Sequence, residues 1–159
     1  MKDIRKQYEI VTTGNKYDLF KAGEHTMSII YSGIKANKMP ETERMYVEAN
    51  HVGCCLHYAM YLVSLLHEAG IKCYFTITPE EDGGNHCSVL YFNEKGDKVI
   101  ADPVMDIKAG TVDKHMCIPY AEFVKNAIRH EISHYDVFGI NGEKAFFNEF
   151  LSLSNCKLQ

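Results

Sequence analysis

Hydrophobic and polar positions change their period near residue 70, and this change divides the secondary structure that the sequence predicts. Up to that point apolar residues recur at helical spacing, so we expect helices over residues 3–10, 17–37, 41–49 and 53–70. Beyond it, runs rich in β-branched and aromatic residues predict strands over residues 72–78, 86–92, 98–101 and 135–140. A further helix is expected over residues 120–129, followed at the C-terminus by an amphipathic segment through Leu153.

Helices followed by mostly sequential antiparallel strands are typical of an α+β domain. A chain of 159 residues has room for one hydrophobic core, and we therefore expect a single domain over residues 1–159. Within it, residues 1–50 are expected to form a helical front part, residues 51–140 the core, and residues 141–159 a C-terminal segment.

The predicted helix over residues 53–70 carries one narrow polar stripe. His57, Ser64 and Glu68 fall within about 40° of one another at 100° per residue, and we expect this stripe to face water. The opposite side of the helix is apolar and is expected to face the interior through Ala59, Leu62 and Leu66.

The same helix begins with two adjacent cysteines. Cys55 projects about 160° from the polar stripe and so lies on the interior side, whereas Cys54 lies about 60° from the stripe. A cysteine in the first turn lies at the positive end of the helix dipole, which favours the thiolate. Cys55 is therefore the candidate nucleophile. The scattered positions of the six cysteines indicate free thiols and not a disulfide framework: they are residues 54, 55, 73, 87, 117 and 156.

The two strands over residues 86–92 and 98–101 are expected to form a hairpin. Its loop ends on Gly96, which suits a type I turn with the glycine in a left-handed bulge. That register places Ser88 opposite Asp102 and makes His86 the diagonal neighbour of Asp102 on the same face, with about 7–8 Å between their backbones. Side chains can close this gap. A nucleophile, a base and an orienting carboxylate are the three parts of a thiol hydrolase, here Cys55, His86 and Asp102.

Four segments resemble the transglutaminase-like cysteine enzymes, which share a papain-like core. Residues 53–59 (GCCLHYA) are similar to the family's G-x-C-x-x-[FY]-A helix start, and residues 65–71 to its helix end. Residues 86–91 (HCSVLY) resemble its H-x-W-x-x-[VY] strand, and residues 99–103 (VIADP) its v-x-D-P segment. The resemblance implies a cysteine-bearing helix packed on an antiparallel sheet, with additional N-terminal helices here.

The resemblance also assigns roles to single residues. It implies that Cys55 is the nucleophile, His86 the general base and acid, and Asp102 the group that orients the imidazole. The family's tryptophan two residues after the histidine is replaced by Ser88, and the protein has no tryptophan. For the oxyanion, the chain offers the backbone N–H of Cys55 and the side chain of Asn50 as candidates.

The implied chemistry is acyl transfer through a thioester, with no cofactor and no metal. Resolution by water gives a peptidase or a protein-glutamine deamidase, and resolution by an amine gives a transglutaminase. The expected partner is a protein or peptide substrate that presents an amide, including a glutamine side chain. The residues themselves do not choose among these outcomes.

Three alternatives compete with this interpretation. His130-Glu131-Ile132-Ser133-His134 matches the H-E-x-x-H pattern of zinc peptidases, in which both histidines must lie on one helix, and Asn148-Glu149 could add a ligand. A cluster of His51, Cys54, Cys55 and His57 could bind a metal in a sensing or structural module. The same fold could also serve as a catalytically silent binding module.

Charge and hydropathy exclude two classes of partner. The net charge is −4 and no basic run occurs, so we expect no binding to nucleic acid or to an anionic membrane. No apolar run approaches the roughly 18 residues that span a bilayer, and the first residues lack the apolar core of a secretory signal. A cytoplasmic protein is the default expectation, although a specialised export route would leave no mark in such a sequence.

Overall fold

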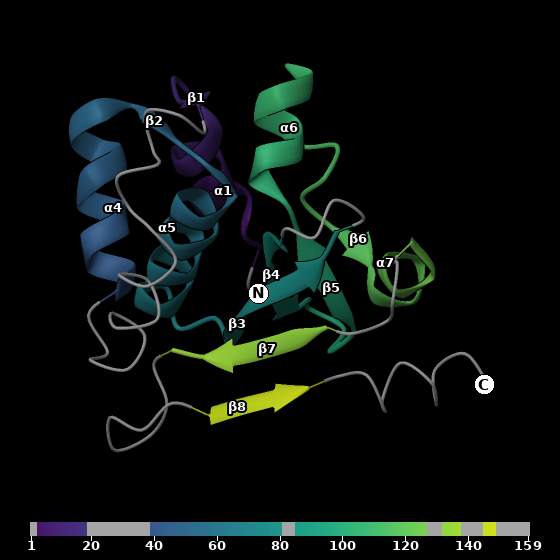
Figure 1. Ribbon diagram of the computed structural model, residues 1–159. Helices are drawn as coiled ribbons and strands as arrows, with labels where there is room; N and C mark the ends of the chain where they lie inside the picture. Colours follow the sequence, from purple (N-terminus) through teal and green to yellow (C-terminus); the bar gives the residue numbers. More distant parts are fainter. Residues whose placement is uncertain (1–2, 19–38, 81–84, 127–131, 138–144, 149–159) are drawn as a thin grey trace.

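The computed structural model describes residues 3–18, 39–80, 85–126, 132–137 and 145–148 (Figure 1). Its helices are α1 (Arg5–Thr12), α4 (Met39–Asn50), α5 (Cys55–Glu68), α6 (Pro103–Ala109) and α7 (Tyr120–Asn126). Its strands are β1 (Lys16–Tyr17), β2 (Val52–Gly53), β3 (Cys73–Pro79), β4 (Asn85–Phe92), β5 (Lys98–Ala101), β6 (Ile118–Pro119), β7 (Ser133–Asp136) and β8 (Ala145–Asn148). The mixture of helices and antiparallel strands confirms the predicted α+β class.

Six strands form one antiparallel sheet in the order β6-β5-β4-β3-β7-β8. The central strands β3 and β4 are neighbours in the sequence and pair with each other, as expected for a mostly sequential antiparallel sheet. The two short strands β1 and β2 pair separately and in parallel. In Figure 1, α4 and α5 lie side by side at the left of the sheet, and α7 lies at its right beside β6.

The two faces of the sheet are covered by different helices. Alternate residues of the central strands join the main core with α5, and these are Cys73, Phe75, Ile77, Cys87, Val89 and Tyr91. The opposite face carries a second cluster with α7, made of Leu90, Ile100, Tyr120, Val124 and Ile132. By the strand alternation, Ser88 points to the face that α7 covers, whereas His86 is the second residue of β4 and lies at the end of the sheet.

Helix α5 is buried along nearly its whole length, and its polar stripe is not exposed as predicted. His57 and Ser64 are fully buried, because α4 packs over them. The ring of Tyr46 lies 4.9 Å from that of His57, centroid to centroid. Arg44 contacts the hydroxyl of Ser64 at 3.3 Å and pairs with Glu68 at the solvent edge. The stripe is therefore a polar contact between two helices.

Several predicted boundaries are corrected by the structure. The segment expected as a helix over residues 17–37 lies mostly outside the described residues, and its first residue belongs to β1, which pairs with β2. Helix α6 was not expected, because Pro103 was interpreted as ending a strand; it occupies the first position of α6 instead. Strand β7 begins two residues earlier than predicted, and β8 lies within the segment expected to be amphipathic. Among the described residues, no helix combines the length and apolar character needed to cross a membrane.

Candidate active site

The predicted hairpin register is confirmed. Tyr91 pairs with Val99, and Val89 pairs with Ala101. The turn closes with Gly96 in the left-handed region at φ 84°, as the bulged turn requires. This register brings His86 and Asp102 together at one end of the sheet, where Nε2 of His86 lies 2.6 Å from Oδ2 of Asp102.

Asp102 lies between β5 and α6 and is held from both directions. As the N-cap of α6, its Oδ1 accepts a 3.4 Å hydrogen bond from the backbone N–H of Met105. Its other oxygen faces His86, and only 5% of the residue is exposed. Pro103 at the first helical position requires no hydrogen bond from its nitrogen and fixes the helix start. One carboxylate thus caps a helix and orients an imidazole.

His86 bridges Asp102 and Cys55. Burial lowers the pKa of His86, but hydrogen bonds with Asp102 and Cys55 outweigh it and raise the pKa to about 10. The imidazole is therefore protonated near neutral pH. Because Nε2 faces Asp102, Nδ1 is the ring nitrogen left for the thiol. The histidine side chain is 22% exposed, so one part of the ring remains accessible.

Cys55 is the first residue of α5 and is half-buried. A hydrogen bond from Cys54 lowers the pKa of Cys55, yet the neighbouring Cys87 thiol and burial outweigh it, and the contact with His86 lowers it less. The pKa of Cys55 therefore lies above its usual range, which corrects the lowering that the helix start predicted. The positive end of the helix dipole favours the thiolate, but burial and the neighbouring Cys87, which the sequence did not place there, favour the thiol.

Cys54 has a different task from Cys55, because it is the N-cap of α5. Its backbone N–H donates to Nδ1 of His57 over 3.2 Å, and its sulfur lies 3.3 Å from the same atom. The hydrogen bond to Cys55 and burial raise the pKa of Cys54 to about 12. The Cys54 thiol therefore stays protonated and donates to the sulfur of Cys55. Gly53 leaves room for the cap, since a Cβ there would lie 2.8 Å from Cβ of His57.

The two oxyanion candidates fare differently. The N–H of Cys55 belongs to the first turn of α5, where N–H groups have no acceptor within the helix. Asn50 ends α4, and its side-chain amide donates to the carbonyl of Tyr46 over 2.9 Å. The Asn50 side chain is thus engaged by its own helix and is not placed as an oxyanion donor.

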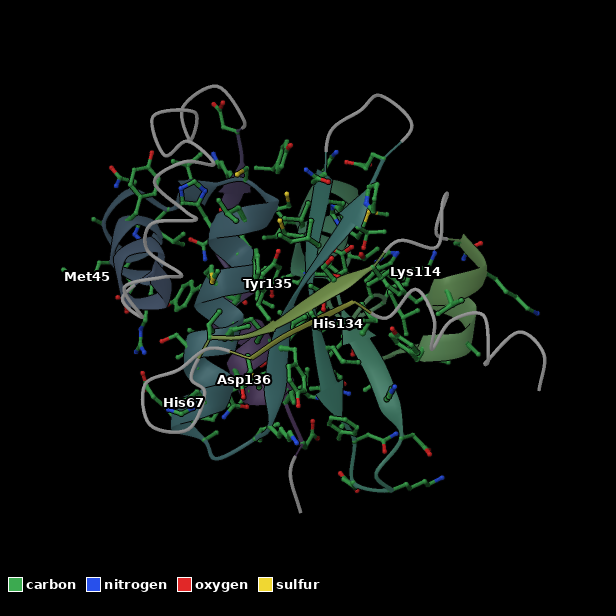
Figure 2. All side chains as sticks on the ribbon, turned by 60° about the horizontal axis from the view of Figure 1, so that its bottom comes forward. Met45, His67, Lys114, His134, Tyr135 and Asp136 are labelled. Carbon is green, nitrogen blue, oxygen red and sulfur yellow. The ribbon has the colours of Figure 1, made fainter. Side chains whose placement is uncertain are left out.

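A cleft of about 620 Å³ opens on the side of the His86–Asp102 pair that faces α7. One wall comes from the end of β3, with Thr78 and Glu80, and the opposite wall from the segment around β6 and from α7. Glu122 and Phe123 of α7 line it together with Lys114, which Figure 2 shows on the α7 side of the sheet. The cleft therefore offers both charged and apolar surface beside the imidazole.

Sequence reasoning missed a buried carboxylate one helical turn after Asp102. Asp106 is fully buried in α6 and accepts hydrogen bonds from Tyr8, Thr111 and His115. The signal was present as Asp-Pro followed by a second aspartate at a spacing of four residues. It would have been found only by predicting the short helix after Pro103.

The zinc interpretation is wrong for His134, because this residue lies in strand β7 and not in a helix (Figure 2). Its Nδ1 lies 2.8 Å from Oγ1 of Thr76, and its Nε2 lies 2.9 Å from the hydroxyl of Tyr120. Burial, and to a smaller extent the charge of Lys98, lower the pKa of His134 to about 3. The other members of the predicted zinc site, His130, Glu131 and Glu149, lie outside the described residues.

The proposed metal cluster at the start of α5 does not form. Nδ1 of His51 lies 3.3 Å from the side-chain oxygen of Asn15 and not beside a thiol. His57 serves the cap at Cys54, as described above. Over the described ranges, no three histidine, cysteine, aspartate or glutamate side chains are grouped so that they could hold a metal ion. The five cysteines within those ranges are free thiols.

Comparison with known proteins yields likenesses to solved structures and none to sequences. No protein-family model and no curated protein sequence matches the chain. A solved structure named "Crystal structure of a TGase" aligns with a TM-score of 0.40 and 14% sequence identity, over 60% of this chain. This chain spans about a quarter of that protein, since 24% of the other chain is covered. A likeness of this size does not establish a family, and the functional conclusion has to come from the site itself.

Proposed function

We propose that the protein is a cysteine-dependent amide hydrolase or acyltransferase, with Cys55 as nucleophile, His86 as proton carrier and Asp102 as the orienting carboxylate. The observation that carries the proposal is the position of His86. Its Nε2 is 2.6 Å from Oδ2 of Asp102, and His86 and Cys55 each shift the pKa of the other. The motifs that resemble transglutaminase-like enzymes support the same three residues.

The first half of the reaction forms a thioester. The Cys55 thiolate attacks the carbonyl carbon of the amide, and a sulfur–carbon bond forms while the carbonyl oxygen becomes an oxyanion. The N–H of Cys55 and the dipole of α5 are positioned to stabilise that charge. The protonated His86 gives its proton to the leaving nitrogen through Nδ1, and the carbon–nitrogen bond breaks.

The second half regenerates the Cys55 thiolate and the protonated His86. His86, now neutral, accepts a proton from water or from an amine, which attacks the thioester and releases Cys55. Asp102 keeps the ring oriented throughout and stabilises the imidazolium each time it forms. The cleft on the α7 side borders His86, so a protein or peptide substrate can place the departing or incoming group there.

The experiment measures both outcomes on the same protein. Purified protein is incubated with glutamine-containing peptides, with and without a fluorescent primary amine, and ammonia release, peptide cleavage and amine incorporation are followed. We expect Cys55→Ala and His86→Ala to abolish all three signals. Cys54→Ala, a matched thiol removal one residue away, should retain activity at a pH high enough to ionise Cys55, because Cys54 influences the pKa of Cys55 but does not attack.

Three results would overturn the proposal. Full activity in Cys55→Ala would remove the nucleophile, and loss of activity on chelation alone would indicate a metal-dependent reaction. A folded wild-type protein that processes no amide, and whose Cys55 forms no thioester by intact-mass measurement, would indicate the silent binding module.

A further inference from the structure

We infer that Asp106 is a positioning residue, which holds the peptide group of Asp102 so that its carboxylate meets His86. This inference rests on the proposed function of the His86–Asp102 pair. It concerns a carboxylate that does not itself border the thiol, and it gives the N-terminal helix α1 a role in the site.

Asp106 uses both oxygens fully. Oδ2 accepts hydrogen bonds from the hydroxyl of Tyr8 and from the backbone N–H of His115, the latter over 2.9 Å. Oδ1 accepts from the hydroxyl of Thr111 and lies 3.0 Å from Nδ1 of His115. Burial raises the pKa of Asp106, but the hydrogen bonds from Thr111, Tyr8 and His115 outweigh it and keep the pKa below its usual range. Asp106 therefore remains an anion at neutral pH.

Two partners of Asp106 hold the backbone of Asp102. The hydroxyl of Tyr8 also contacts the carbonyl oxygen of Asp102 at 3.1 Å. The carbonyl oxygen of His115 accepts the N–H of Asp102 over 2.8 Å. The N–H and the carbonyl of Asp102 are thus each contacted by a residue that also binds Asp106, and the single hydroxyl hydrogen of Tyr8 is shared between Oδ2 of Asp106 and this carbonyl.

This support matters because Asp102 occupies a junction and not a regular element. Its backbone has φ −128° and ψ 82°, between the end of β5 and the start of α6. Within the helix cap, its carboxylate and its carbonyl oxygen share one donor, the N–H of Met105, at 3.4 and 3.2 Å. A displacement of about 1 Å in such a group can cost on the order of 100-fold in rate, and the 2.6 Å contact with His86 leaves little tolerance.

The test compares two buried tyrosines. Tyr8→Phe removes a hydroxyl that contacts the carbonyl of Asp102 at 3.1 Å, and Tyr91→Phe removes one that donates to the carbonyl of Met116 at 3.0 Å. Both tyrosines are buried, so each variant removes one buried hydroxyl; Tyr8→Phe also removes the hydrogen bond to Asp106, which is the link under test. The readouts are the pKa of His86 by NMR and the pH dependence of Cys55 alkylation by iodoacetamide, located by mass spectrometry.

We expect Tyr8→Phe to lower the pKa of His86 by about one unit, a tenfold change in its protonation constant, and to shift the alkylation profile with it. Tyr91→Phe should leave both unchanged. Asp106→Asn should shift the pKa of His86 further in the same direction. If Asp106→Asn does not fold, as judged by circular dichroism, the pair of tyrosine variants decides the question.

Asp102→Asn separates this inference from the proposed function. If Asp102→Asn lowers the pKa of His86 but Tyr8→Phe does not, or if Tyr91→Phe lowers it equally, the positioning role of Asp106 is wrong and the proposed pair stands. If Asp102→Asn itself leaves the pKa of His86 unchanged, the pair fails and the proposed function fails with it.

Discussion

Removing the charge of Asp102 should return His86 to the titration of a buried imidazole. The pKa of His86 is about 10 because Asp102 and Cys55 together overcome the effect of burial. In a Cys55→Ala background, Asp102 alone counteracts the lowering of the His86 pKa by burial. Asp102→Asn then removes this remaining raising effect. We expect the pKa of His86 in the double variant to fall below its ordinary value of 6.5.

The effect on the free energy of unfolding follows from the pKa shift of His86. A rise from 6.5 to about 10 corresponds to roughly 5 kcal/mol at 1.36 kcal/mol per unit, shared between Asp102 and Cys55. A raised folded-state pKa contributes stability that is fully present below about pH 6.5 and is lost as the pH rises through about 10. The free energy of unfolding should therefore differ between Cys55→Ala and the double variant by a few kcal/mol (~2–4) near pH 6. That difference should vanish near pH 11.

The assay combines NMR titration of the His86 ring with urea unfolding of both variants across this pH range. Asparagine is as good an N-cap as aspartate, so α6 should be retained. Asp97→Asn, an exposed carboxylate in the turn of the same hairpin, is the matched control and should change neither quantity. A pKa near 6.5 in the Cys55→Ala background, or a stability difference that does not depend on pH, would refute the reasoning.

Three further predictions follow from the same contacts. Because the pKa of Cys55 is raised and that of His86 is about 10, the rate of amide turnover should increase from neutral to alkaline pH and fall again above about pH 10; a rate that is maximal near pH 6 would contradict this. Cys87→Ala should lower the pKa of Cys55 and Cys54→Ala should raise it, as measured by the pH dependence of iodoacetamide alkylation, because the two thiols act on Cys55 in opposite directions; shifts of the same sign would exclude that arrangement. The folded-state pKa of His134 is lowered to about 3, so below pH 6.5 the unfolded chain binds a proton that the folded protein does not bind. The free energy of unfolding should therefore decrease by about 1.4 kcal/mol for each pH unit below 6.5. In urea unfolding, His134→Gln should show a pH dependence that is flatter by that amount.

Local patterns were sufficient for the parts of the site that lie close together in the chain. The turn length and the two-residue period of β4 and β5 fixed the register, and the register alone placed His86 near Asp102. The helical period placed Cys55 on the interior side of α5 together with Ala59, which is fully buried. These inferences hold because strand pairing across a tight turn and the helical repeat depend on neighbouring residues only.

Long-range packing decided the rest. The polar stripe of α5 is buried because α4, which the period of α5 cannot reveal, covers His57 and Ser64. The pKa of Cys55 is raised because Cys87, on the facing strand, lies against it. Tyr8 reaches the carbonyl of Asp102 from 94 positions away. By itself, the sequence determined which side chains could form a thiol, imidazole and carboxylate constellation. Only the tertiary structure determined their protonation and their support, because both depend on burial and on neighbours that periodicity does not encode.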